Sequence, residues 1–261
     1  GALVLDEKGK LIKIAAKAVI LATGGGAGIF EHNSNPEGIS GDGCILALRA
    51  GASLLNMEYV HFYPIGLVGA SFPHRRAGPT ILRYDGAVLV NSKGEDIVKK
   101  HLGLTLQRAI MIPTVRFEML SKIVAMEGRN GGAFIDLTGF PSKTWDFLLS
   151  AIWQKAFLDK APVDLRKQRC PVIPLAHTFL GGVRMNIKSE TTIPGLFAAG
   201  EVVGGTYSGE AGANQLSRCM TMGALAGLNA TPFVRGIKSA EVKEQEWQPI
   251  ISRLEAQVKG K

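Results

Sequence analysis

The segment from residue 177 to residue 227 places the tightest limit on what this chain can fold into. Residues 197–199 predict a short buried strand, and Gly200 and Glu201 follow it directly. A glycine-rich loop comes next, and then an apolar helix that begins near residues 214–217. Glycines let backbone approach a ligand closely, and a helix start presents free N–H groups. A carboxylate at such a turn can accept hydrogen bonds from ribose or ribitol hydroxyls, so this order of elements predicts a nucleotide cofactor.

A second glycine turn lies near the N-terminus. Residues 17–22 form a continuous apolar run, as expected of a strand buried on both faces of a parallel sheet, and the run ends at Thr23, Gly24 and Gly25. Glycine contributes 32 of the 261 residues, and the excess lies at turns rather than in low-complexity tracts. We therefore expect the two turns, 23–25 and 199–201, to converge around one cofactor.

These two stretches carry a family resemblance. Residues 194–205 read PGLFAAGEVVGG and are followed by GANQL and an apolar helix, while residues 17–26 read KAVILATGGG. The pattern resembles the fumarate reductase/succinate dehydrogenase flavoprotein family, which includes L-aspartate oxidase, over roughly the first 230 residues. The resemblance implies FAD as the cofactor. It also implies an α/β fold, with part of a Rossmann-like FAD-binding domain carrying an inserted α+β capping domain.

The resemblance assigns cofactor contacts to the two turns and to two helix starts. Glu201 would contact the FAD ribitol, with a surface acid at a strand end as the alternative. Asp42 would pack beside the cofactor, although its residue type alone indicates an N-cap or first-turn acid. The N–H groups near Met220 and Thr221 would face the flavin pyrimidine, where a helix dipole stabilises negative charge on reduced flavin. The expected cofactor-binding residues are Thr23, Gly24, Gly25, Asp42, Gly200, Glu201, Asn214, Met220 and Thr221.

The side chains of the two methionines at this helix start are expected in the hydrophobic core rather than at the cofactor. Met220 and Met222 are of a type that fills irregular gaps in apolar interiors. We therefore predict that both side chains lie in the core, while the backbone near Met220 faces the cofactor.

The family's substrate site is only partly present. Its F-H-P-T-G motif appears as residues 62–66, with Tyr63 for His and Ile65 for Thr. Its GANRLGGNS motif appears as residues 212–220, where Gln215 replaces a carboxylate-binding Arg and Arg218 follows three residues later. Removal of a bidentate Arg from a desolvated carboxylate site costs several kcal/mol of binding free energy. We therefore expect a substrate that is less anionic than a dicarboxylate.

The remaining candidates come from the family's other substrate motifs. His177 lies in the H-x-x-G-G segment and would bind an anionic substrate, unless backbone groups satisfy it at a strand start. Arg83 opens a segment similar to R-G-E-G, whereas the position of the family's acid Arg falls on Gly103, followed by Arg108. The candidate catalytic residues are therefore His177, Tyr63, Arg83 and Arg218, with Tyr63 and His177 as acid/base or orienting groups.

Element order divides the chain into four parts. They are a first FAD-binding segment (1–64), a capping domain (65–171), a second FAD-binding segment (172–232) and a helical tail (233–261). Within them the patterns predict a strand over 56–63 closed by Pro64, helices over 44–52, 114–126 and 142–157, and a C-terminal amphipathic helix over 241–261. The tail helix would place Trp247, Ile250, Ile251 and Leu254 on or near one face.

Composition excludes several classes of protein. The net charge is +8, but the basic residues are scattered without interleaved aromatics, which argues against nucleic acid as a partner. The three cysteines lack metal-site spacing and indicate a reducing, cytoplasmic setting. No apolar run is long enough for a transmembrane segment. The family's strand–GxGxxG–helix unit is missing, so we expect these residues alone to bind FAD poorly and to be inactive.

The sequence thus predicts an FAD-dependent oxidoreductase subunit that transfers hydride or electrons between flavin and a small organic substrate, such as a carboxylate. An iron–sulfur subunit is a candidate electron-transfer partner. Two alternatives stay open at this point. One is a true fumarate reductase or L-aspartate oxidase with a rearranged site, and the other is a non-catalytic electron-relay or structural subunit that keeps the flavoprotein fold.

Overall fold

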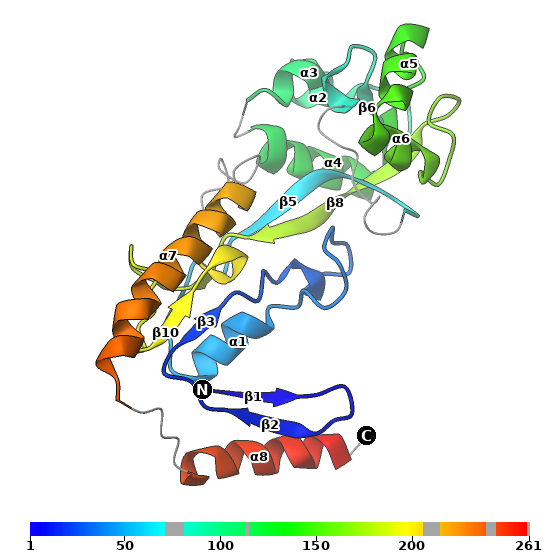
Figure 1. The fold of residues 1–261 in the computed structure, drawn as a ribbon. Coiled ribbons are helices and arrows are strands. Elements are labelled where there is room, and N and C mark those ends of the chain that lie inside the picture. The colour runs from blue at the N-terminus through cyan, green and yellow to red at the C-terminus, as the bar shows by residue number, and fades with distance from the viewer. Residues whose placement is uncertain (71–80, 113–114, 206–214, 239–243, 260–261) are drawn as a thin grey trace.

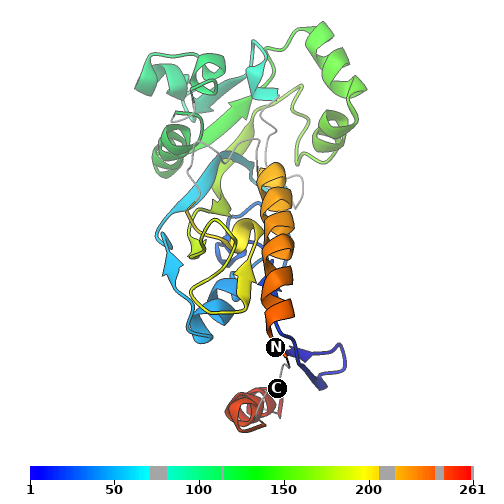
Figure 2. The ribbon, with the colours of Figure 1, turned by 60° about the vertical axis from the view of Figure 1, so that its left-hand side comes forward.

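The protein combines a glycine-rich α/β part with an antiparallel sheet covered by helices (Figure 1). The computed structural model describes residues 1–70, 81–112, 115–205, 215–238 and 244–259. The N-terminal hairpin and the C-terminal helix lie together at one end of the molecule, and the helix-covered sheet lies at the other (Figures 1 and 2). Both expected turn regions belong to the part between them.

The α/β part is organised by two parallel strands that lie far apart in the sequence. Strand β3 (Val19–Leu21) pairs in parallel with β10 (Leu196–Ala198). Helix α7 (Gln215–Gly236) packs along β10, and Phe233 of α7 stacks edge-on against Phe197. Helix α1 (Asp42–Arg49) buries its small residues in a second cluster, which contains Ala198 of β10. The two clusters together explain why a short apolar strand such as 197–199 can be fully buried.

The remaining short elements of this part complete its frame. Strand β4 (Leu54–Leu55) pairs antiparallel with β9 (Gly182–Val183), and the N-terminal hairpin joins β1 (Ala2–Leu5) to β2 (Leu11–Ile14). Two 3-10 turns, η1 (Ala27–Ile29) and η4 (Gly200–Val202), belong to the same part.

One expectation about β3 is wrong. The apolar run 17–22 predicted a strand buried on both faces, but Ile20 is 43% exposed. Strand β3 pairs only with β10 among the described residues, and two strands provide too little sheet to cover both faces.

The second part is built on a four-stranded antiparallel sheet. Its strands are β5 (Val60–Leu67), β8 (Cys170–Phe179), β7 (Ala133–Asp136) and β6 (Val88–Asn91), in that order across the sheet. The helical elements around it are η2 (Ile81–Arg83), α2 (Ile97–Leu102), α3 (Leu106–Ala109), the π-helical turn η3 (Val115–Met119), α4 (Leu120–Arg129), α5 (Ser142–Ser150) and α6 (Ile152–Asp159). Its largest hydrophobic cluster includes Leu89, Ile135 and Leu120, which are fully buried. This core is separate from the cores around β10.

Strand β5 differs from its prediction in both bounds. It begins at Val60 and continues through Pro64 to Leu67. A proline lacks the N–H that a sheet ladder needs, but the register between β5 and β8 shifts between Tyr63 and Gly66. A proline is tolerated at such a bulge. The strand therefore does not end at Pro64.

Two predicted helices are interrupted. The predicted helix 142–157 breaks at Ala151, whose extended backbone (φ −89°, ψ 118°) separates α5 from α6. In place of a uniform helix over 114–126, a π-helical turn leads into α4, which continues to Arg129; residue 114 lies outside the described residues. The periodicity of apolar residues cannot predict a helix break at one extended residue or a single π-helical turn, because the apolar spacing on either side is nearly preserved.

The C-terminal tail forms helix α8 (Glu244–Lys259), as expected. Trp247 and Ile251 are buried, and the Trp247 ring lies beside Gly1 at the start of the hairpin. Ile250, which was expected near the same face, is 52% exposed. Within the described ranges, no helix is both long and apolar enough to cross a membrane.

A buried carboxylate holds the helical side of the sheet together. Glu127 on α4 accepts hydrogen bonds from His101 Nε2 (2.7 Å), Lys100 Nζ (3.1 Å) and Asn91 Nδ2 (3.3 Å). The hydrogen bond with His101 and those from Lys100 and Asn91 lower the pKa of Glu127. A lowered carboxyl pKa means that this stabilisation is present at pH values above the ordinary 4.5 and is lost as the pH falls through the folded-state value.

Glu127→Gln is expected to lower the free energy of unfolding by about 2 kcal/mol at pH 7, because charge-assisted hydrogen bonds are lost. The difference from the wild type should shrink as the pH falls below 4.5, which urea denaturation at several pH values would measure. Glu118→Gln is the control, since the Glu118–Lys122 pair is exposed and contributes at most about 1 kcal/mol. An equal effect of the two substitutions would contradict the assignment.

Candidate functional site

The two glycine turns meet, as the sequence predicts. Because β3 and β10 are parallel neighbours, their carboxyl ends lie at the same edge, and Ala199 N donates to Leu21 O (3.0 Å). A Cβ added at Gly25 would lie 2.1 Å from Glu201 Oε1. The turn at 23–25 is therefore in direct contact with the Glu201 side chain, and only a glycine leaves room for it.

The Glu201 carboxylate is fixed by backbone. Its Oε1 accepts a hydrogen bond from Phe179 N (3.1 Å), at the end of β8. Burial raises the pKa of Glu201, and the hydrogen bond from Phe179 opposes that shift. Gly200 and Gly24 both have left-handed backbone (φ +79° and +78°), which a side chain would strain.

Helix α1 closes the same edge. Gly41 N donates to Gly25 O (3.1 Å), and a Cβ at Gly43 would lie 1.7 Å from Thr23 Oγ1. Asp42 is the first residue of α1 and its side chain makes no capping bond, so it is a first-turn acid rather than an N-cap. Thr23 and Asp42 are both exposed. Two polar side chains, closely approaching glycine backbone and a held carboxylate form an edge that suits the hydroxyl groups of FAD.

The other expected cofactor contacts lie at the start of α7. Asn214 is outside the described residues, and α7 is described from Gln215. Met220 is 76% exposed, so the expectation that its side chain lies in the core is wrong, whereas Met222 packs against two core clusters. Thr221 and Arg218 line an open cavity of about 590 Å³ together with Gln215.

A second cluster of polar and aromatic side chains lies on β5 and β8. The register places His61 opposite Thr178 and Phe62 opposite Ala176, which leaves His177 as the extra residue of a β-bulge. Bulges re-aim side chains and are common beside active sites. The His177 ring centroid lies 5.8 Å from that of Tyr63 and 5.9 Å from that of His61.

The loop after η1 holds His177 in place. Ser34 Oγ lies 2.6 Å from His177 Nδ1, and Asn35 Nδ2 donates to His177 O (2.9 Å). The ring is therefore bonded to a side chain 143 residues away in sequence number rather than satisfied only by backbone. His177 also lies within β8, not at the start of a strand. No local pattern could have pointed to Ser34.

Arg83 joins this region, together with an arginine that sequence reasoning missed. Tyr63, Arg83, Arg116 and Phe117 line a small cavity of about 10 Å³, room for about one water molecule. The Arg116 Cζ lies 5.5 Å from the Phe117 ring centroid. The exposed Arg108 is not among the residues that line this cavity. Arg116 lies outside the motifs that carry the family resemblance, so no spacing in the sequence distinguished it.

The structure does not bring Arg218 to this cluster. Arg218 lines the cavity beside α7, and that cavity shares no lining residue with the one that contains Tyr63 and Arg83. Three of the four candidate catalytic residues, His177, Tyr63 and Arg83, therefore lie around β5 and β8, and Arg218 lies elsewhere.

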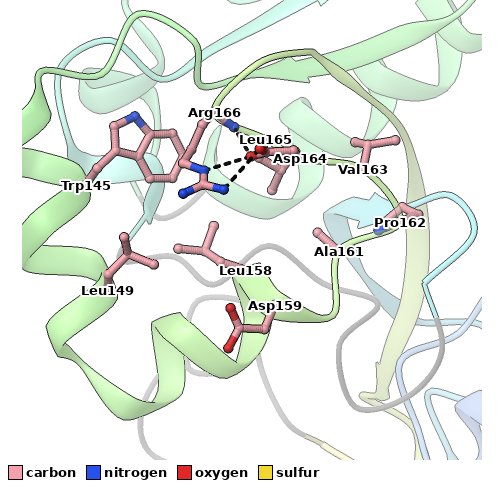
Figure 3. A pocket seen from close by; sticks show the side chains of 10 residues that line it. All are labelled: Trp145, Leu149, Leu158, Asp159, Ala161, Pro162, Val163, Asp164, Leu165 and Arg166. Carbon is pink, nitrogen blue, oxygen red and sulfur yellow. Dashed lines mark hydrogen bonds and ion pairs between the residues drawn. The ribbon is translucent and has the colours of Figure 1, made fainter.

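A third cavity, of about 370 Å³, lies between α5, α6 and the segment before β8 (Figure 3). Trp145, Leu149 and Leu158 form its apolar wall. Its charged groups are already paired: Arg166 makes two hydrogen bonds to Asp164 (2.8 and 3.0 Å), which lower the Asp164 pKa to about 2, and Asp159 pairs with Lys155. Because these charges already pair with neighbouring side chains, we assign no binding or catalytic role to this cavity.

Comparison with known proteins places the chain among flavoproteins. It is 36% identical over 236 residues to an uncharacterized FAD-dependent oxidoreductase of Methanocaldococcus jannaschii (90% of this chain, 42% of the relative). It is 33% identical to the L-aspartate oxidase of Bacillus subtilis (83% and 38%), and 31% identical to the Escherichia coli fumarate reductase flavoprotein subunit (86% and 39%). The chain thus spans about two fifths of the length of these curated relatives.

Solved structures agree on the fold. A quinol–fumarate reductase with menaquinol molecules matches with a TM-score of 0.75 at 27% identity, over 96% of this chain and 45% of that one. Mycobacterium smegmatis Sdh1 in complex with UQ1 matches with a TM-score of 0.72 at 31% identity, over 90% and 39%. These matches confirm the expected α/β, FAD-binding flavoprotein fold. Since the model of the FAD binding domain family matches residues 1–217, this chain belongs to that family, and its cofactor is FAD.

Proposed function

We propose that this protein is an FAD-dependent oxidoreductase that transfers hydride between the flavin and a small organic acid. One observation carries the proposal: strand β8 connects the two sites directly. Phe179 N holds the Glu201 carboxylate, and His177, two residues earlier, faces Tyr63. Residues two apart on a strand are separated by only about 7 Å. A substrate beside His177 would therefore lie within reach of a flavin held at the Glu201 turn.

The residues at the glycine turns fit FAD. Glu201 would accept hydrogen bonds from ribitol hydroxyls, while the glycines at 24–25 let backbone approach the cofactor. Bound FAD supplies the hydride chemistry of the reaction. The exposed Thr23 and Asp42 beside this edge would add polar contacts.

The cluster on β5 and β8 would bind the substrate. The Arg83 and Arg116 guanidiniums would hold one carboxylate, because both line the cavity beside Tyr63. Since that cavity has room for about one water molecule, the two side chains would move apart to admit the carboxylate. The Tyr63 hydroxyl and the His177 imidazole would orient the substrate and deliver the proton that the adjacent carbon needs when an alkene accepts hydride. Ser34 would fix the orientation of the imidazole. The packed rings of Phe117 and Phe179 would limit access of water.

The four-part division of the chain and its setting belong to the same proposal. The separate hydrophobic cores support a capping domain (65–171) inserted between FAD-binding segments (1–64 and 172–232), with a tail (233–261). The free cysteines support a reducing, cytoplasmic setting. Relatives called flavoprotein subunits support an electron-transfer partner, for which an iron–sulfur protein is the candidate.

His177→Ala in the complete, FAD-loaded protein is expected to lower kcat/KM by about 100-fold, because a positioned acid/base group is lost. The measurement is anaerobic reoxidation of the reduced flavin by a panel of α,β-unsaturated carboxylic acids, including fumarate and its monomethyl ester. Lys155→Ala, at an exposed ion pair away from the site, is the control. Absence of reoxidation by every acid in the wild-type protein would favour a non-catalytic subunit instead.

A further inference from the structure

His61 is a buried polar group without a hydrogen-bond partner in the part of the chain that the structure describes. Its side chain is 4% exposed, and neither ring nitrogen has a hydrogen-bond partner among the described residues. A buried polar group without a partner costs about 1–3 kcal/mol. With respect to the described residues, His61 is therefore either a net cost to stability or a group whose partner arrives with a ligand.

The surroundings of His61 point to a ligand. His61 and Tyr63 share the buried face of β5, and the bulge in β8 turns His177 toward both of them. Phe117 packs edge-on against the His61 ring, with centroids 4.4 Å apart, and closes one side. Three hydrogen-bonding rings thus gather at a place where two strands depart from regular pairing.

The charge state of His61 restricts what it can bind. Burial lowers the His61 pKa to about 4, so the ring is neutral at pH 7. A neutral imidazole offers one N–H donor and one nitrogen acceptor, which suits a carbonyl or hydroxyl group. A carboxylate is better matched by cations. The cations Arg83 and Arg116 line the neighbouring cavity together with Tyr63 and Phe117, and His61 is not among the residues that line it.

We propose that His61 binds a neutral oxygen of the substrate, so that the enzyme takes acids with one carboxylate and one uncharged carbonyl or hydroxyl group. The carboxylate would lie at Arg83 and Arg116, and the neutral group would lie among His61, Tyr63 and His177. This inference rests on the proposed function, because it assigns the substrate class of the same site. It also agrees with Tyr63, an uncharged side chain, at the position of the motif histidine.

The test compares two probes that differ only in the second group. Fumarate carries two carboxylates, and monomethyl fumarate carries one carboxylate and one ester carbonyl. The difference spectrum of the oxidised flavin in the complete, FAD-loaded protein gives Kd for each without requiring turnover. The wild type is expected to bind the monoester about tenfold more tightly than fumarate, since one hydrogen bond to a neutral partner is matched and one buried carboxylate is avoided.

The variants separate a ligand contact from a packing role. His61→Phe should weaken monoester binding by about tenfold and change fumarate binding by less than about twofold, while the melting temperature stays equal or rises. His61→Gln, which keeps a donor and an acceptor, should restore most of the monoester affinity. The matched control is Ser121→Ala, which removes a buried hydroxyl that donates to Phe62 O on the same strand and should leave both Kd values unchanged.

Two results would overturn the assignment: tighter binding of fumarate by the wild type, or a monoester Kd that both His61 variants leave unchanged. If the Phe variant does not fold, the Gln variant and the wild-type preference decide. Failure of the proposed function would give a different result. Neither probe would then reoxidise the reduced flavin, even if both bind to the protein.

Discussion

Gly25→Ala is expected to lower the FAD affinity of the complete protein by about 10- to 100-fold, the equivalent of one charge-assisted hydrogen bond. The new Cβ would lie 2.1 Å from Glu201 Oε1 and 2.4 Å from its carboxyl carbon, so the carboxylate must move. Its hydrogen bond from Phe179 N would be lost at the same time. The flavin-to-protein absorbance ratio after gel filtration, together with a fluorescence titration of the apoprotein, measures the effect.

Two further variants test whether the loss of FAD affinity is specific to this turn. Glu201→Ala should lower FAD affinity to a similar extent, because both changes remove the carboxylate from the same place. Gly128→Ala should leave FAD binding unchanged, since Gly128 lies in α4 with open space around the added Cβ. Full FAD retention by both the Gly25 and the Glu201 variants would show that this turn does not hold the cofactor.

Gly181→Ala is expected to destabilise the protein by about 3 kcal/mol or more, on the order of 10 °C in melting temperature for a chain of this size. A Cβ at Gly181 would lie 2.2 Å from Asn56 O and 2.6 Å from Met57 Cα. Both are backbone atoms, so relief requires separation of two chain segments rather than rotation of a side chain. Thermal unfolding followed by circular dichroism is the measurement.

The same Gly128→Ala variant is the control for stability. Alanine is favoured over glycine within a helix by about 1 kcal/mol, so this substitution should leave the melting temperature unchanged or raise it. A melting temperature for Gly181→Ala equal to that of the wild type would mean that the approach of residues 56–57 to residue 181 is not as close as described.

Local chemistry was sufficient to predict much of the cofactor edge. Residues 197–201 give a strand, a glycine turn and an acid in direct succession, and the apolar run that ends at Thr23 is also a pattern of adjacent residues. Parallel strands of one sheet end at the same edge, so contact between the two turns followed once both strands were assigned. The continuation of β5 through Pro64 was not predictable, because a proline is acceptable only where a bulge removes the need for its N–H.

The sequence by itself determined the family, the cofactor and the strand ends that hold Glu201 near Gly25, because those depend on residue types at short spacing. Only the tertiary structure decided which side chains face one another around His177. Ser34 and His61 come from two segments distant in the chain from His177, and a bulge sets the direction of the His177 ring. Contacts between segments distant in the chain bring these side chains together, and such contacts produce no periodic pattern in the sequence.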